Sequence, residues 1–309
     1  MKEIINYYYN LDCLEIEENK NYASFNYYGD NFYFVFFNRT KEELDDLINI
    51  SQELIQKGIK VHTFVLNRFN SYITKVGDNN YVLLKINCNK DEVVNFWDLT
   101  HNLKLFKLNT KNSKLYRNNW GELWSKKIDY FEYQIKELGK DKQIVLNSFS
   151  YYVGMAENAI SYVNKINKVL GESEFDNIVL SHRRIFFPNT HLNYLNPLSF
   201  IFDLEVRDIA ESLKVGFFHN EDSLLDLRTY LKTNKLSKYS YHMLYARLLY
   251  PSYYFDIYES IMNNNEIEEK LLPIIKKVND YERFLKLAYE EISIYTNLER
   301  IIWILKKEL

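Results

Sequence analysis

The residues best suited to chemistry lie between positions 182 and 203, where their spacing matches one used for phosphoryl transfer. His182, Arg184 and Asn189 are two and five residues apart, and an apolar run further along ends in Asp203. Enzymes with this spacing carry an Asp at the middle position to accept the proton of the substrate hydroxyl, while the Asn and the later Asp hold Mg²⁺. The spacing therefore predicts a metal ligand at Asp203 and puts an arginine where the catalytic base belongs. A lone Asp after an apolar strand can instead be a cap or a salt-bridge residue, and both interpretations of Asp203 stay open at this point.

Arg184 cannot act as that base. Its guanidinium stays protonated at any cellular pH and offers only hydrogen-bond donors. A general base contributes roughly 10²- to 10⁴-fold to the rate. We therefore expect no catalytic residue among His182, Arg184 and Asn189, which form a degenerate loop. If Arg184 lies within reach of Asp203, its fixed charge could replace Mg²⁺ by pairing bidentately with the carboxylate.

Three further segments accompany this loop in the order found in a known family. They are residues 151–160, residues 207–211, and residues 246–256 with Glu259 beyond them. With these segments the chain resembles the aminoglycoside phosphotransferase and homoserine kinase branch of the protein-kinase-like fold. Within that branch it is most similar to the spore coat CotS/YutH-type proteins, and the resemblance covers most of the chain.

The resemblance implies a bilobal α+β fold, with a small β-rich N-lobe that carries one helix and a larger helical C-lobe. It implies that Arg207 and Asp208 form a structural motif, with Asp208 capping its helix or bracing the catalytic loop. It also implies that His182 hydrogen-bonds the loop backbone rather than shuttling protons. A bacterial protein of this type would be made in the cytoplasm and incorporated into the spore coat, if the source organism sporulates.

The parts that handle nucleotide phosphates in such enzymes have no counterpart in the N-terminal sequence. These parts are a Gly-rich hairpin and a lysine on the third strand. The candidate hairpin, residues 17–21, has two glutamates and no glycine, and the candidate strand, residues 31–37, has no lysine. Leu47 aligns with the glutamate that would pair with that lysine, and a shift of one helical turn would bring in Glu43 or Asp46 instead. No cofactor is therefore expected.

Hydrophobic periodicity predicts strands first and helices afterwards. A capping-box pattern at Thr40 and Glu43 predicts the start of one helix, and Gly58 its end. Strands are expected around that helix and apolar stripes of helical period after residue 90. We predict an N-lobe of residues 1–87 and a helical C-lobe of residues 88–309. The predicted strands cover 14–17, 22–28, 32–37, 61–66, 72–76 and 81–86, and the predicted helices cover 120–138, 156–170, 206–217, 236–249, 267–278 and 281–305.

Composition excludes several classes of protein. The 309 residues are 47% hydrophobic and carry a formal net charge of −3, so no global field draws in nucleic acid. The two cysteines, Cys13 and Cys88, lack metal-ligand spacing and fit a reducing compartment. The longest apolar run, residues 32–37, is too short to span a bilayer, and the N-terminus does not read as a secretory signal. We expect a cytoplasmic protein without membrane insertion.

Three functional hypotheses follow. The first is a catalytically inactive kinase-fold protein, a pseudokinase, that acts as a scaffold or binding module for protein partners such as spore coat components. The second is a divergent small-molecule phosphotransferase in which ATP and Mg²⁺ bind, Asp203 holds the metal and another acidic residue supplies the base. The third is a small-molecule sensor that keeps an acceptor pocket without nucleotide chemistry.

Overall fold

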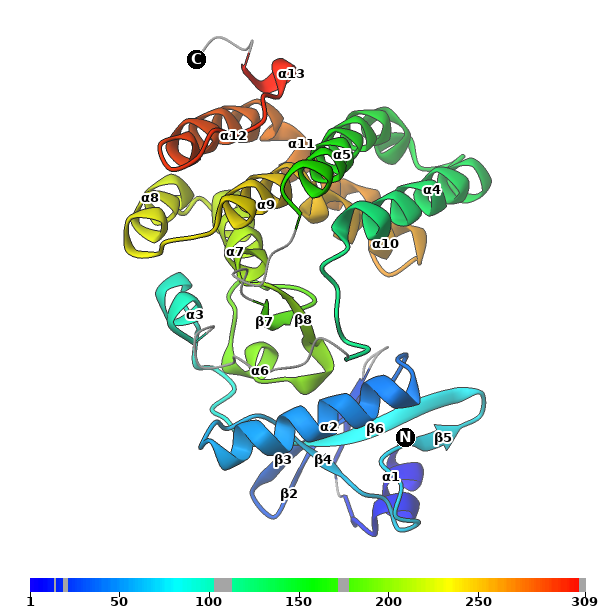
Figure 1. The fold of residues 1–309 in the computed structure, drawn as a ribbon. Coiled ribbons are helices and arrows are strands. Elements are labelled where there is room, and N and C mark those ends of the chain that lie inside the picture. The colour runs from blue at the N-terminus through cyan, green and yellow to red at the C-terminus, as the bar shows by residue number, and fades with distance from the viewer. Residues whose placement is uncertain (14, 19–21, 103–112, 172–177, 306–309) are drawn as a thin grey trace. The chain divides into compact units, whose positions relative to one another are not determined.

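A computed structural model describes the chain except for residues 14, 19–21, 103–112, 172–177 and 306–309 (Figure 1). Its described residues form two compact units. The first unit contains Met1–Val94, Asn109–Tyr116 and Pro188–Ile201, and the second contains Asn95–Leu108, Arg117–Phe187 and Phe202–Leu309. The first unit therefore includes a segment, Pro188–Ile201, that lies far along the chain from the predicted lobe of residues 1–87.

The first unit is built on a six-stranded antiparallel sheet (Figure 1). Its strands run in the order β1, β2, β3, β6 and β4, and β5 also pairs with β6. Alternate side chains of β2 and β3 are buried, as the period of two in the sequence predicts. The strands are β1 (Glu17–Glu18), β2 (Tyr22–Tyr27), β3 (Asp30–Phe36), β4 (Thr63–Val65), β5 (Thr74–Val76) and β6 (Asn79–Ile86).

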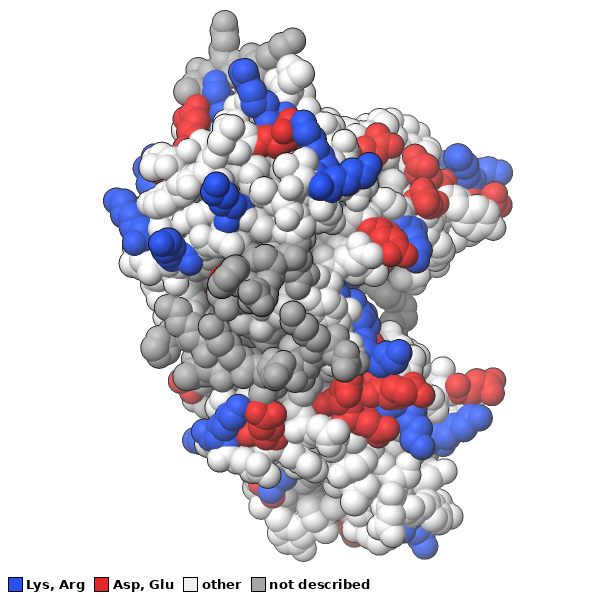
Figure 2. All heavy atoms as spheres, in the orientation of Figure 1, with Lys and Arg blue, Asp and Glu red and all other residues white. Residues whose placement is uncertain are grey.

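The helix of the first unit, α2 (Lys41–Gln56), begins where the sequence predicts. The Thr40 hydroxyl accepts a hydrogen bond from the Glu43 amide and the Glu43 carboxylate accepts one from the Thr40 amide, each at 3.2 Å. Gly58 follows the helix with φ of +82°, in the left-handed region that favours glycine. The predicted capping box is confirmed. Acidic side chains gather on the surface over α2 (Figure 2).

The second unit is largely helical, and its core surrounds α9 (Lys238–Leu249), of which every residue from Tyr239 to Leu249 is buried. Helix α5 and helix α7 both pack against α9. Two short elements, α6 (His191–Tyr194) and the 3₁₀ turn η1 (Pro197–Ser199), belong to the first unit. The other helices are α3 (Phe96–Asn102), α4 (Trp120–Leu138), α5 (Gln143–Val169), α7 (Val206–Phe218), α8 (Ser223–Thr233), α10 (Ser252–Met262), the 3₁₀ turn η2 (Glu268–Leu271), α11 (Leu272–Lys276), α12 (Val278–Ser293) and α13 (Ile302–Leu305).

Several predicted element boundaries are wrong. The N-terminal residues form a helix, α1 (Lys2–Tyr9), which buries Ile5 and Tyr9 against the sheet. Helix α5 starts 13 residues before the predicted position 156, because its buried stripe continues back to Val145. The helix predicted over 267–278 is divided into η2 and α11, with Pro273 in the first turn of α11 where a new helix can start. The helix predicted over 281–305 is interrupted between α12 and α13.

Three further expectations concern the N-terminal strand, the thiols and the membrane. The strand predicted over 14–17 is replaced by the two-residue β1, and Leu14 lies outside the described residues. Cys13 and Cys88 are both free thiols. No helix among the described residues is long and apolar enough to cross a bilayer.

Candidate functional site

Two short strands position most of the predicted loop. Strand β7 (Ile178–His182) ends at His182, and its partner β8 (Phe200–Leu204) carries Asp203 near its end. All five residues of β8 are buried, and α7 begins only two residues after it. His182, Arg184, Asp203, Arg207 and Asp208 therefore all belong to the second unit.

Asn189, the third member of the predicted loop, belongs to the first unit. Its side chain is buried, and its carbonyl oxygen accepts a hydrogen bond of 2.6 Å from the Val94 amide. The next residue, Thr190, forms an isolated β-bridge with Val93. These contacts give Asn189 a place in the backbone framework of the first unit.

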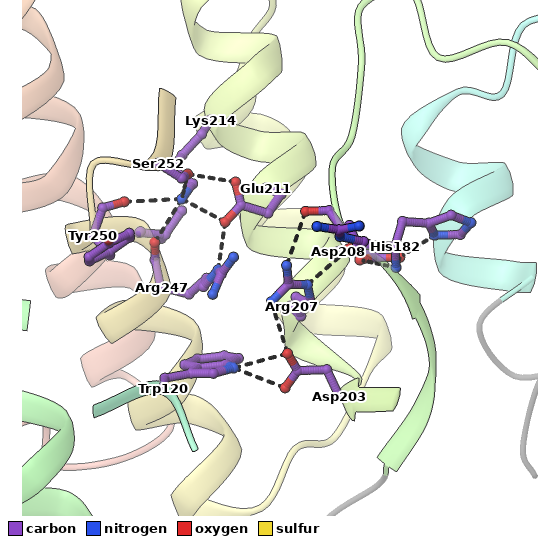
Figure 3. Close-up of polar contacts among 12 residues, drawn as sticks. Trp120, His182, Asp203, Arg207, Asp208, Glu211, Lys214, Arg247, Tyr250 and Ser252 are labelled. Atoms are coloured by element: carbon purple, nitrogen blue, oxygen red, sulfur yellow. Dashed lines mark hydrogen bonds and ion pairs between the residues drawn. The ribbon is translucent and has the colours of Figure 1, made fainter. Parts of the chain in front are cut away.

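The carboxylate of Asp203 is fully enclosed (Figure 3). The indole Nε1 of Trp120 donates to both oxygens, at 2.9 and 3.0 Å. Arg207 Nη1 donates to Oδ2 at 2.9 Å, and the amide of Leu204 donates to Oδ1 at 2.8 Å. Three N–H groups thus occupy most of the roughly four acceptor positions that a carboxylate offers. Burial raises the pKa of Asp203, and Arg207 and Arg247 act in the opposite direction.

Arg207 also fastens the end of β7. Its Nε donates to the carbonyl of His182 at 3.0 Å and its Nη2 to the carbonyl of Arg183 at 3.1 Å. One guanidinium therefore joins the two strands and the start of α7, using the fixed fork of donors that only arginine offers.

Asp208 braces the same strand end. Its carboxylate accepts the backbone amide of His182, at 3.1 and 3.2 Å, and contacts the ring Nδ1 of His182 at 2.7 Å. Both side chains are buried, at 3% and 0% exposure. Of the two roles expected for Asp208, this geometry corresponds to bracing the loop. The Asp208 carboxylate also contacts the ring of His182.

A second group of charges extends the enclosure deeper into the helices (Figure 3). Lys214 Nζ has four acceptors within hydrogen-bonding distance for its three N–H groups: Glu211 at 2.9 Å, Ser252 Oγ at 2.6 Å and the carbonyls of Arg247 and Tyr250. Arg247 Nε donates to the same Glu211 oxygen, and Ser252 Oγ donates to the other at 2.7 Å. Each polar head in this group thus has a direct partner.

The charges of this buried network balance. Its carboxylates are Asp203, Asp208 and Glu211, and its cations are Arg207, Lys214 and Arg247. Burial lowers the pKa of Lys214 to about 8 although Glu211 opposes the shift. Burial alone would raise the pKa of Glu211, but Lys214, Arg247 and Arg207 together hold it below its usual value. The network is therefore a set of paired, desolvated ions.

Arg184 takes a different partner from the one we considered. Its Nη2 pairs with Asp256 at 3.0 Å and with Glu259 at 3.1 Å. Lys127 pairs with the same Glu259 oxygen at 3.0 Å. The hypothesis that Arg184 neutralises Asp203 is therefore corrected, because Arg207 has that role and the partially exposed Arg184 is bound to α10.

Aromatic rings cover this network. Trp124 lies between Trp120 and Tyr250, with ring centroids at 5.5 and 4.2 Å. The guanidinium of Arg247 lies 5.0 Å from the Trp120 ring and 5.5 Å from the Trp124 ring. All three rings are buried. Trp120 also hydrogen-bonds Asp203, a contact that the sequence did not predict.

The residues present do not fit a Mg²⁺ site in this arrangement. Mg²⁺ requires near-octahedral oxygen ligands at about 2.1 Å. Both oxygens of Asp203 already accept from protein donors, so a metal would have to displace Arg207. Among the described residues, no cluster of three or more His, Cys, Asp or Glu side chains is arranged to hold a metal ion.

The N-terminal strands occupy the positions at which a kinase of this fold carries its nucleotide-binding hairpin and lysine. Strand β3 has the sequence DNFYFVF and contains no lysine. The candidate hairpin begins with Glu17 and Glu18 in β1, while its residues 19–21 lie outside the described residues. Of the acids that could have paired with a lysine, Glu43 is in the capping box and Asp46 accepts from Ser113 Oγ at 2.6 Å.

Comparison with known families agrees with the sequence. The model of the family described as "Spore coat putative kinase YutH" matches residues 2–288. The chain belongs to this spore coat YutH family. The endospore coat-associated protein YutH of Bacillus subtilis is 31% identical over 209 residues, which are 60% of this chain and 61% of that protein. The match therefore spans less than two thirds of that relative.

Solved structures share the fold. An aminoglycoside phosphotransferase from Alicyclobacillus acidocaldarius aligns over 93% of this chain and 94% of its own, with a TM-score of 0.62 and 11% identity. An AMP-bound spectinomycin phosphotransferase aligns over 96% and 98%, with a TM-score of 0.57 and 12% identity. A choline kinase from Streptococcus pneumoniae aligns over 95% and 98%, with a TM-score of 0.51 and 14% identity. The predicted α+β, kinase-like fold class is confirmed.

Proposed function

We propose that this spore coat YutH-type protein is a catalytically inactive kinase-fold protein that acts as a scaffold or binding module among coat proteins. The observation that carries the proposal is the enclosure of Asp203, the residue at the metal-binding position, by Trp120 and Arg207. The printed name of the Bacillus subtilis relative supports the coat context. Under this proposal the protein is made in the cytoplasm, needs no ATP or Mg²⁺, and meets its partners at the coat.

The energetics of the enclosure support this proposal. To bind Mg²⁺, Asp203 would have to leave the buried Arg207 without its carboxylate partner. Breaking a buried ion pair by removing one partner costs about 3–5 kcal/mol. Metal binding would have to offset that cost before any catalysis could begin.

The catalytic position supports it as well. Arg184 cannot accept a proton, and the two carboxylates nearest to its guanidinium, Asp256 and Glu259, are held in ion pairs with it. The loop is therefore fastened to α10 at the position where an enzyme needs a free base.

A divergent phosphotransferase is the second candidate, because one acid near Arg184 is chemically suited to replace the base. Partial burial raises the pKa of Asp256, while Arg184 and Lys127 act against the shift. A carboxylate with a raised pKa suits general-base catalysis. In this alternative, ATP and Mg²⁺ bind, Asp203 turns to the metal, and Asp256 takes up the hydroxyl proton.

Thermal unfolding with millimolar ATP, in Mg²⁺ and separately in EDTA, tests the proposal. A ligand present at 100 times its dissociation constant stabilises a folded protein by about 2.7 kcal/mol. We expect no Mg²⁺-dependent rise in the unfolding temperature. A rise of several degrees in Mg²⁺ that disappears in EDTA and in Asp203→Asn would contradict the proposal and support the phosphotransferase. Stabilisation by an amino-alcohol or sugar, but not by ATP, would indicate the sensor hypothesis.

A further inference from the structure

An exposed group of two aromatic rings and an arginine stands out on the first unit. It consists of Tyr7 from α1 and of Arg68 and Phe69 from the loop after β4, and we call it the aromatic patch. Tyr7 is 55% exposed and Phe69 57%. Large apolar side chains that lie together on a surface mark interaction sites more often than isolated ones do.

The loop that displays the patch is held rigidly from beneath by Asn67, which is only 4% exposed. Its Oδ1 accepts from the amides of Phe69 and Ser71, at 3.0 and 3.1 Å. Its Nδ2 donates to the carbonyl of Ile73 at 3.1 Å and to Thr74 Oγ1 at 3.2 Å. Because four bonds to one buried amide fix the loop in the free protein, little conformational entropy remains to be lost on binding.

Arg68 contacts both rings of the patch. Its amide donates to the carbonyl of Tyr8 at 2.7 Å, and its Nη1 donates to the carbonyl of Tyr7 at 3.3 Å. Its guanidinium lies 4.8 Å from the Tyr7 ring centroid and 5.5 Å from that of Phe69. Over the described residues, Arg68 forms no ion pair, so its charge is available to a carboxylate on a binding partner.

The patch also has a carboxylate at its edge. Glu3 is exposed and precedes Tyr7 by four residues, so the two side chains lie on the same face of α1. Glu3, too, has no ion-pair partner within the described part of the chain. One basic and one acidic side chain thus accompany the exposed rings, and this arrangement can be complementary to itself.

We propose that the aromatic patch is a self-association surface, which binds the same patch on a second copy of this chain. In a two-fold interface, a contact between two different residues occurs twice, once in each direction. Arg68 of each copy therefore faces Glu3 of the other copy, while the rings pack between these two ion pairs. Tyr, Phe and Arg are enriched at such interfaces. The patch is small, so the dimer is weak and transient. This goes beyond the proposed function, since a scaffold that dimerises presents two copies of every other surface.

Sedimentation analysis of the full chain at about 5 to 500 μM tests the proposal, because that range brackets a weak dimer. We expect the average mass to rise with concentration toward that of a dimer. Arg68→Glu and Glu3→Arg should each raise the dissociation constant by about tenfold or more, through like charges across the interface. The double variant restores opposite charges and should recover most of the association.

Two further variants control for packing and folding. Phe69→Ser should weaken association without altering any charge, while Tyr133→Ser, which removes a 64% exposed ring from α4, should leave it unchanged. Each variant should unfold within a few degrees of the natural protein. The proposal is overturned if the natural chain stays monomeric throughout this range. It is also overturned if it dimerises equally well with Arg68→Glu and Phe69→Ser, because a different surface would then form the dimer.

Discussion

Replacing Asp203 with asparagine separates a structural role of this residue from a metal-binding one. The substitution keeps the shape of the side chain and removes its charge. Arg207 then faces an amide instead of a carboxylate, although it stays inside the same enclosure with Arg247 and the ring of Trp120 nearby. Both cations were balanced in part by the lost charge.

The expected loss is large because Asp203 has no exposed surface and Arg207 is 8% exposed. Removing one partner from a buried ion pair costs about 3–5 kcal/mol, since the other charge stays desolvated and unpaired. At least one donor also loses its acceptor, because an asparagine oxygen cannot serve every donor that the two carboxylate oxygens accept. We therefore expect Asp203→Asn to lower the free energy of unfolding by about 3–5 kcal/mol.

Urea unfolding followed by tryptophan fluorescence measures this change selectively. The four tryptophans, Trp97, Trp120, Trp124 and Trp303, all belong to the second unit, so the signal reports the unit that contains the site. Asp129→Asn is a matched control, because Asp129 is exposed on α4 and should change stability by less than about 0.5 kcal/mol. Unchanged or higher stability of Asp203→Asn without metal would refute the reasoning, since residues kept for function often cost stability.

Three further predictions concern two buried side chains, His62 and Lys214, and the exposed helix cap at Thr40. Burial lowers the pKa of His62 from 6.5 to about 4. Between pH 4 and pH 6.5, the unfolded chain therefore binds a proton at His62 that the folded chain does not bind. Stability should fall as the pH drops through that window, by about 3 kcal/mol, and circular dichroism of urea unfolding should show a shallower fall for His62→Phe; parallel profiles would contradict this. Lys214→Met should cost about 3–5 kcal/mol by leaving Glu211 with one fewer cation, and adding Glu211→Gln should recover part of it; strictly additive losses would count against the coupling. Thr40→Ala should cost about 1 kcal/mol in the same assay, and no loss would show that the capping box is dispensable.

Local patterns predicted the elements whose causes are local. The capping box at Thr40 and Glu43 fixed the start of α2, and the stripe from Trp120 to Leu138 gave the bounds of α4. The start of α5 was missed because its first turns carry polar residues between the buried ones. The interruption after Ser293 was missed because it leaves no proline or glycine in the sequence.

The site was predicted in part for the same reason. The spacing of the catalytic motif identified the positions of Asp203 and Arg184, but it did not predict the residues that bind them. Asp203 meets Trp120 across 83 residues, and Arg184 meets Glu259 across 75. Arg207 follows Asp203 by four residues, but this spacing did not predict their ion pair. An i, i+4 pair is expected only within one helix, and here a strand ends and a helix begins between the two residues. Partners that are distant in sequence become visible only when the fold brings them together.

The central claim, that Asp203 is bound by Arg207 and is not a metal ligand, is tested most directly by titrating Mn²⁺ in the presence of ATP. Electron paramagnetic resonance measures the free ion, and Mn²⁺ accepts the same oxygen ligands as Mg²⁺. We expect the natural protein and Asp203→Asn to give the same titration as ATP alone. A loss of free Mn²⁺ that requires the natural protein, and that Asp203→Asn abolishes, would contradict the claim.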